Sequence, residues 1–162
     1  RHRPWAMGRH TVHYDPFFYP LDAVAGWNPL YGARGFFQHQ CAVPKAAAPA
    51  AIERLLRLTG AHRQGSFLVV LKLFGARKSP GLLSFPMEGA TLALDLPNRG
   101  ETTRTLLADM TAAAMEAGGR VYPAKDAAMS AEAFRAGYPE WRRLEALRDP
   151  KIMSDFWRRV AQ

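Results

Sequence analysis

The sequence predicts an α+β domain, and three observations support this class. A strongly apolar run at 66–74 lies between two glycines, and a run of clean apolar and polar alternation at 90–96 follows it. Apolar residues recur at helical spacing before this pair, at 50–59, and after it, at 101–117. Strands and helices in this succession are typical of an antiparallel sheet with helices packed on one face.

Length and composition fit one globular domain. The chain has 162 residues, of which 48% are hydrophobic, enough to bury a core. Residues 1–16 show no periodicity, so we expect a linker from an upstream segment, followed by one domain at 17–162. No apolar run approaches about 18 residues and no signal-peptide pattern opens the chain. We therefore expect a cytoplasmic protein with at most a peripheral attachment to a membrane.

The net charge of +8 indicates attraction to an anionic partner: nucleic acid, a phosphorylated or nucleotide-bearing ligand, or a membrane surface. The basic residues are scattered, and the tight pairs 142–143 and 158–159 fall on predicted helix surfaces, where solvated charges are usual. A single cysteine, Cys41, excludes an internal disulfide and a cysteine-based zinc cluster. Its place on a core-facing strand position favours a small buried hydrophobe over a catalytic thiol.

The segment at 15–31 is rich in aromatic residues and punctuated by prolines, which predicts irregular structure. Its aromatic side chains need burial, either over the domain's own core or against an upstream part of the protein.

The stretch 35–44 then predicts a strand whose two faces differ. Alternation places Gln38 and Gln40 with Phe36 on one face. The other face carries Phe37, His39, Cys41 and Val43. The two amides need hydrogen-bond partners or a wet surface, and the strand alone leaves both open.

After this strand we expect an amphipathic helix at 50–59, stopped by Gly60. The run 66–74 is almost continuously apolar, which predicts a central strand covered on both faces. Lys72 shares a face with Leu68 and Val70, so its ammonium needs an anionic or polar partner there.

The strand at 90–96 turns Leu92, Leu94 and Leu96 toward the core, and Thr91, Ala93 and Asp95 toward the other face. A helix at 101–117 and a short strand at 120–124 follow. The order from residue 36 is thus the ferredoxin-like βαββαβ order, with both helices on one face, where they cover residues such as Phe67 and Leu71. The face opposite the helices would be bare, as expected of a ligand or domain interface. It would carry Gln38, Gln40, Leu68, Val70, Lys72, Thr91 and Ala93.

The remaining sequence predicts C-terminal helices. Lys125 follows the fourth strand, and Ser130 caps a helix that runs to residue 141. A turn at 144–148 and a closing helix at 154–160 complete the chain, with Phe156, Trp157 and Val160 as core contacts. The sequence contains no Gly-rich phosphate loop, no His-x-x-x-His or Cys pair for a metal, and no serine elbow. We therefore expect a binding module, or one wall of a site completed by another domain.

Several segments, taken in order, resemble the C-terminal part of FAD-linked oxidoreductases of the vanillyl-alcohol-oxidase superfamily, in the group of decaprenylphosphoryl-β-D-ribose 2'-oxidases. These segments are 17–22 with Trp27 and Asn28, 31–40, 71–75, 83–86 and 119–126. The resemblance runs from about Asp15 to the end of the chain. It implies that an upstream domain of the same polypeptide binds most of the FAD, and that this part roofs the flavin with its open sheet face.

The resemblance also implies site residues and an activity. Gln38, Gln40, Leu68, Val70, Thr91 and Ala93 would bind substrate; Gln40, Tyr122 and Lys125 would contact the cofactor; and Lys125 and Lys72 would be catalytic. The reaction would be oxidation of a secondary alcohol of a sugar or polyol, including phosphorylated or lipid-linked ones, by hydride transfer to flavin. The fragment alone would be inactive and would not bind FAD tightly.

Two positions depart from the group. Mycobacterial members have asparagine and then cysteine where this chain has Thr91 and Ala93, so a sugar or polyol other than a decaprenyl-phosphoryl pentose is equally open. The alternative function is a non-enzymatic ferredoxin-like module for RNA or another anionic partner. Modules of that kind stack bases on aromatic residues of the central strands, whereas this chain has mainly Leu, Val, Gln and Lys there. Nucleic acid is therefore the less favoured partner.

Overall fold

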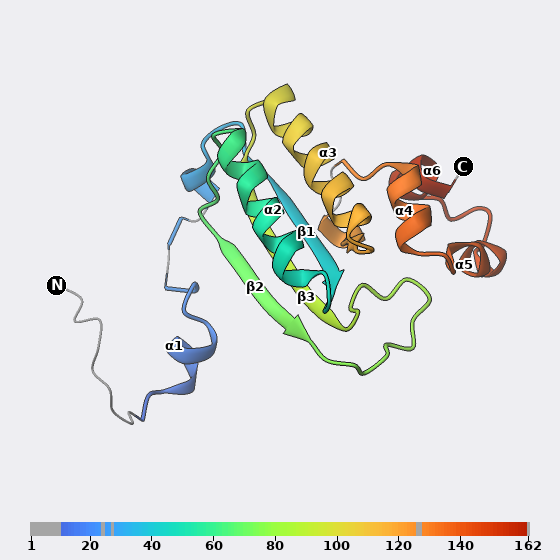
Figure 1. Ribbon diagram of the computed structural model, residues 1–162, viewed down its shortest axis with the longest axis horizontal. Helices are drawn as coiled ribbons and strands as arrows, with labels where there is room; N and C mark the ends of the chain where they lie inside the picture. The colour runs from blue at the N-terminus through green and yellow to red at the C-terminus, as the bar shows by residue number, and fades with distance from the viewer. Residues whose placement is uncertain (1–10, 24, 27, 126–127, 162) are drawn as a thin grey trace. The chain divides into compact units, whose positions relative to one another are not determined.

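The computed structural model describes residues 11–23, 25–26, 28–125 and 128–161 (Figure 1). The chain divides into two compact units, Arg1–Ala33 and Arg34–Gln162. The first unit holds the short helix α1 (Tyr14–Phe18) and the 3₁₀ turn η1 (Asn28–Tyr31). Phe17, Phe18 and Tyr19 are exposed, so these side chains are not buried over the domain's own core, and their burial against an upstream part of the protein stays a prediction. Trp27 lies outside the described residues.

The second unit is built on a four-stranded antiparallel sheet with the order β2-β3-β1-β4. Its strands are β1 (Phe36–Pro44), β2 (Val69–Phe74), β3 (Gly89–Pro97) and β4 (Arg120–Val121). Helix α2 (Ala48–Ala61) joins β1 to β2, and α3 (Glu101–Glu116) joins β3 to β4. The α+β class is confirmed, and the predicted βαββαβ succession is present. Strand β4 is shorter than predicted because the 3₁₀ turn η2 (Pro123–Lys125) replaces its second half.

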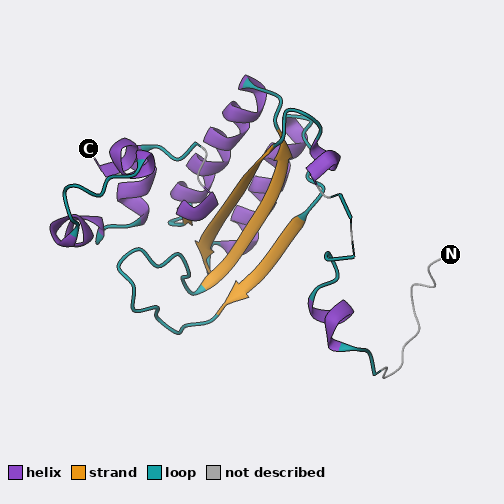
Figure 2. Ribbon diagram, turned by 180° about the vertical axis from the view of Figure 1, so that it is seen from behind, coloured by secondary structure: helices purple, strands orange, loops and turns teal. Residues whose placement is uncertain are grey.

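Helices α2 and α3 lie on one face of the sheet (Figure 1), and the view from behind shows the other face free of helices (Figure 2). The core lies between the sheet and these helices. Its fully buried side chains come from both layers: Val43, Leu92, Leu94, Leu96, Leu55, Leu106 and Met110. The predicted core-facing alternation of β1 and β3 is therefore confirmed. Cys41 is also buried, and burial raises the pKa of its thiol to about 12, as expected for a structural cysteine.

The prediction of a central strand at 66–74 is wrong. Strand β2 begins at Val69 and lies at the edge of the sheet, beyond β3. Helix α2 packs against β1 and β3, so Phe67, Leu71 and Leu73 remain exposed by 64%, 57% and 83% instead of lying under a helix. Ser66 precedes the strand, and its hydroxyl accepts a hydrogen bond from the Asp95 N–H at 2.8 Å.

The C-terminal helices are shorter and more numerous than predicted. Helix α4 (Ala131–Gly137) is capped by Ser130, whose Oγ accepts from the Ala133 N–H at 3.1 Å, as expected. Helix α4 ends at Gly137, and α5 (Trp141–Leu147) occupies the predicted turn. Helix α2, which lies before this region, ends one residue after Gly60, where the sequence predicts its end.

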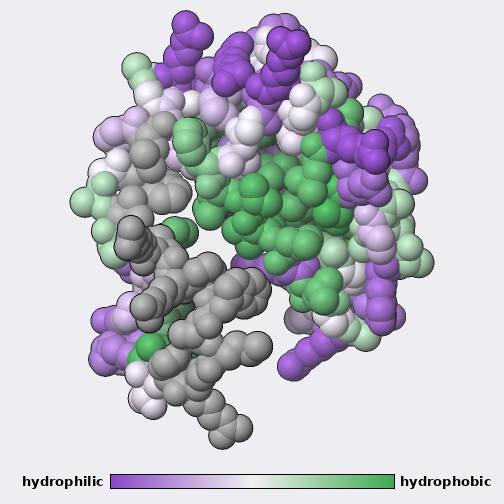
Figure 3. Space-filling model, turned by 60° about the vertical axis from the view of Figure 1, so that its left-hand side comes forward, coloured by the Kyte–Doolittle hydropathy of each residue, from purple (hydrophilic) through white to green (hydrophobic). Residues whose placement is uncertain are grey.

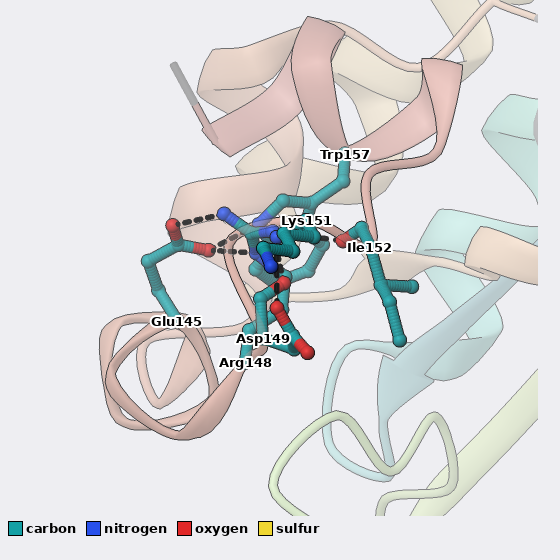
Figure 4. Close-up of polar contacts among 6 residues, drawn as sticks. All are labelled: Glu145, Arg148, Asp149, Lys151, Ile152 and Trp157. Atoms are coloured by element: carbon teal, nitrogen blue, oxygen red, sulfur yellow. Dashed lines mark hydrogen bonds and ion pairs between the residues drawn. The ribbon is translucent and has the colours of Figure 1, made fainter.

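Helix α6 (Asp155–Ala161) closes the chain and buries Trp157 and Val160, as predicted. A polar network ties α6 to α5 (Figure 4). Glu145 accepts two hydrogen bonds from Arg148, at 2.8 and 2.9 Å, and a third from the indole of Trp157. The bonds from Arg148 and then from Trp157 hold the pKa of Glu145 at about 2.

None of the described helices is long and apolar enough to cross a membrane.

Candidate functional site

The open face of the sheet, opposite α2 and α3, collects the polar strand residues in rows set by the strand register. One row pairs Lys72 with Thr91, and the next pairs Val70 with Ala93 and Ala93 with Gln40. A third row pairs Asp95 with Gln38. Residues directly opposite each other in antiparallel strands share a face, so the predicted grouping of these residues is confirmed.

The two glutamines of β1 take hydrogen-bond partners from β3. Gln38 Nε2 donates to Asp95 Oδ1 at 2.7 Å, and Gln40 Nε2 donates to Thr91 Oγ1 at 3.1 Å. Asp95 and Thr91 are 2% and 1% exposed, whereas both glutamines are half-buried. The amides are therefore held in fixed orientations by buried partners, and one N–H donor of each amide is satisfied within the sheet and not by water.

The loop at 75–88 covers part of the open face, so the prediction of a wholly bare face is wrong. Phe85 of this loop is 6% exposed and stacks on Tyr122 with ring centroids 4.5 Å apart. Phe85 also meets Phe74 edge-on at 6.0 Å. Arg120 donates from Nη1 to the carbonyl of Ser84 at 3.1 Å and fixes the loop from the β4 side. Elsewhere on this face, Gln38, Gln40 and Val70 are half-buried, and Lys72 is exposed.

Lys72 does not occupy the environment that the sequence predicts. It lies on the edge strand, its side chain is exposed, and within the described ranges it forms no ion pair. The expected anionic partner is absent there because β2 is not covered on both faces, so water solvates the ammonium.

Lys125 ends the 3₁₀ turn after β4, at the strand end where the sequence predicts it. It is half-buried, and its N–H donates to the carbonyl of Tyr122 at 3.1 Å. Lys125, Gln38 and His39 line a cavity of about 20 Å³, room for one water molecule. Strands β2 and β4 are separated by two others, so their axes are about 14 Å apart. Lys72 and Lys125 therefore lie at opposite edges of the sheet and do not converge. Leu107 and Thr111 of α3 also line the cavity beside Lys125, so this cavity lies on the helix side of the sheet.

Sequence reasoning missed two residues at this site, Asp95 and Phe85, and gave no role to His39, which lies on the helix-covered face opposite Leu94. The alternation of β3 places Asp95 on the open face, and this pattern alone was enough to include Asp95 among the candidate site residues. Phe85 belongs to the 83–86 segment, but no periodic pattern shows that a loop folds over a sheet. His39 is 3% exposed, and neither ring nitrogen has a partner among the described residues. Burial lowers its pKa to about 4.

Comparison with known proteins finds similarity to an oxidase. The chain is 38% identical over 152 residues to decaprenylphosphoryl-β-D-ribose oxidase of Mycolicibacterium smegmatis, across 89% of this chain and 32% of that protein. It is 33% identical over 145 residues to a Streptomyces coelicolor protein described as an uncharacterised protein in the mprA 5' region, across 86% and 39% of the two chains. The chain thus spans 32% and 39% of the lengths of these two relatives. No family model matches it.

Proposed function

We propose that this chain is the C-terminal substrate-binding portion of an FAD-dependent oxidoreductase that oxidises a secondary alcohol of a sugar or polyol. The observation that carries the proposal is the 38% identity, over 89% of the chain, to an oxidase whose name specifies decaprenylphosphoryl-β-D-ribose. The open sheet face supports it, because Gln38 and Gln40 lie there beside the apolar side chains of Val70 and Ala93. Oriented amides on a partly apolar wall are suited to binding sugar hydroxyls.

The residues present fit a flavin at the β1–β4 side of this face. The backbone N–H of Tyr122 donates to the Gln40 carbonyl at 2.8 Å, so an amide and a phenol lie on neighbouring strands, with Lys125 just beyond them. An amide, a phenol and an ammonium provide the hydrogen-bond donors and acceptors that the polar edge of a flavin requires. We assign Gln40, Tyr122 and Lys125 to hold it. Bound FAD would supply the hydride acceptor.

The substrate side of the site is assigned to Gln38, Gln40, Leu68, Val70, Thr91 and Ala93. Gln38 and Gln40 each use one amide N–H on Asp95 or Thr91, which leaves the second N–H as a donor and the carbonyl oxygen as an acceptor for substrate hydroxyls. Lys125 would stabilise the oxygen of the reacting alcohol as it loses its proton, or would take that proton itself. Lys72, on the solvent-exposed edge, is better placed to meet an anionic group of the substrate than its reacting carbon.

The test uses the full-length protein that contains this chain. We expect it to purify with visible flavin absorbance, and we expect that absorbance to bleach when a sugar or polyol substrate is added without oxygen. A protein that stays colourless after reconstitution with FAD would overturn the proposal. Screening pentose phosphates against free pentoses and polyols then identifies the substrate class, because Thr91 and Ala93 leave that choice open.

A further inference from the structure

The outer side of β2 carries a hydrophobic surface that the proposed function does not use. We define the β2 edge surface as Phe67, Val69, Leu71 and Leu73, whose side chains are 64%, 51%, 57% and 83% exposed. A groove of about 480 Å³ between α2 and β2 adjoins it, with Ile52 among its lining residues. Figure 3, turned to bring this side of the molecule forward, shows hydrophobic residues gathered over one area. Neighbouring exposed apolar side chains beside a groove are typical of an interface.

The backbone of β2 offers hydrogen bonds on the same side. The Asp95 N–H donates to the Leu68 carbonyl at 3.3 Å, so Leu68 and Asp95 form a hydrogen-bonded pair. Such pairs alternate along an antiparallel ladder. In the observed register, Val69, Leu71 and Leu73 therefore direct their N–H and C=O groups away from β3, toward the open edge.

Strand β2 lacks the devices that protect natural sheet edges. It contains no proline, and its one charged residue, Lys72, projects from the opposite face of the sheet from Leu71 and Leu73. Edge strands exposed to water are usually short, charged or covered, because unpaired apolar edges recruit other strands. The apolar run at 66–74 is instead the kind of sequence found in interior strands.

We propose that a β-strand from elsewhere in the full-length polypeptide pairs with β2 and makes it an interior strand. This inference rests on the proposed function only in taking the chain as part of a longer protein. The chain spans 32% of the oxidase it resembles, so a protein of that length has ample sequence to supply the strand. The pairing segment is extended, exchanges backbone hydrogen bonds with Val69, Leu71 and Leu73, and lays apolar side chains over the groove beside α2.

Residue-resolved amide hydrogen exchange in the full-length protein tests this pairing. We expect the outward amides of Val69, Leu71 and Leu73 to be protected as strongly as the inward amides of Val70 and Lys72, at least ~100-fold relative to an unpaired strand. Exchange of the three outward amides at the rate of the loop after Phe74 would overturn the proposal. Protection that disappears on dilution to monomers would also overturn it, because a second copy would then be the partner.

A matched pair of variants adds an independent measurement. Leu73→Lys places a charge where the pairing strand would lie, so we expect a melting temperature lower by several degrees and at least ~10-fold faster exchange at Leu71. Leu147→Lys, on α5 and 78% exposed, is the control and should change neither. If Leu73→Lys changed the melting temperature and the exchange rate at Leu71 as little as the control does, the result would contradict the pairing. Both readouts are independent of flavin: a colourless protein with protected amides would refute the proposed function alone, and a flavin-loaded protein with fast amides would refute the pairing alone.

Discussion

Gln38 and Asp95 are joined across β1 and β3 by a hydrogen bond of 2.7 Å from the amide Nε2 to the carboxylate Oδ1, and Asp95 is 2% exposed. A buried carboxylate needs hydrogen-bond donors, and here Gln38 supplies one of them. The bond fixes the amide of Gln38, so its remaining carbonyl oxygen points in a defined direction on the open face. The same contact therefore serves stability and orients a residue that we assign to substrate binding.

Replacing Gln38 with methionine should lower the free energy of unfolding by about 1–3 kcal/mol, because a buried carboxylate loses a donor. Gln40→Met is the matched control, since its partner Thr91 accepts through a neutral hydroxyl oxygen, which costs less to leave without a donor than a carboxylate, and we expect a loss of only about 0.5–1.5 kcal/mol. Urea denaturation at neutral pH measures both values. Equal losses in the two variants would show that the charge of Asp95 does not affect the free energy of unfolding.

Acid should destabilise the protein through His39. Burial lowers the pKa of His39 to about 4, below its ordinary value of 6.5, so the unfolded chain binds the proton first as the pH falls. This contribution is complete above about pH 6.5 and is lost toward pH 4, by on the order of 3 kcal/mol in total.

The variant His39→Leu tests this pH dependence. It removes the titrating group and two ring nitrogens that have no partner among the described residues, so its stability should fall less steeply over this range. Denaturation midpoints at several pH values measure the difference. Parallel curves for the variant and the original protein would contradict the prediction.

The Cys41 thiol should resist chemical modification in the folded protein. It is fully buried on β1, and its pKa of about 12 leaves almost no thiolate near neutral pH. We expect alkylation by iodoacetamide to be at least ~100-fold slower in the native state than in denaturant. Mass spectrometry of timed samples measures the rate, and rapid native labelling would mean that β1 opens or that the thiol lies elsewhere.

The sequence predicted the local elements better than their covering layers. Alternation in β1 and β3 placed Gln38 and Thr91 on one face correctly, because strand geometry alone decides it. The same reasoning failed for Leu71, since an apolar run cannot show whether a helix or another strand will cover it. It also missed Phe85, whose position depends on ring contacts with Phe74 and Tyr122 that are distant in sequence.

Lys125 and Lys72 should differ in their effect on flavin reduction in the full-length protein, because they lie at opposite edges of the sheet. Lys125 follows Tyr122 at the side that we assign to the flavin, so Lys125→Ala should slow anaerobic flavin reduction by about 10²–10⁴-fold. Lys72→Ala, at the solvent-exposed edge, should weaken substrate binding and slow reduction at saturation by less than about tenfold. The melting temperature should stay unchanged in both variants, and the flavin content should stay unchanged in Lys72→Ala. Because Lys125 is also assigned to hold the flavin, the rate of Lys125→Ala is measured on protein saturated with FAD.

The variant Lys125→Arg separates the two roles open to Lys125. Arginine keeps the positive charge but does not give up a proton near neutral pH. Substantial activity in Lys125→Arg would indicate stabilisation of a developing alkoxide, whereas a loss as deep as in Lys125→Ala, with flavin and substrate still bound, would favour proton abstraction. Stopped-flow absorbance of the flavin gives these rates directly. A Lys125→Ala protein that reduces its flavin at the original rate would remove Lys125 from the site.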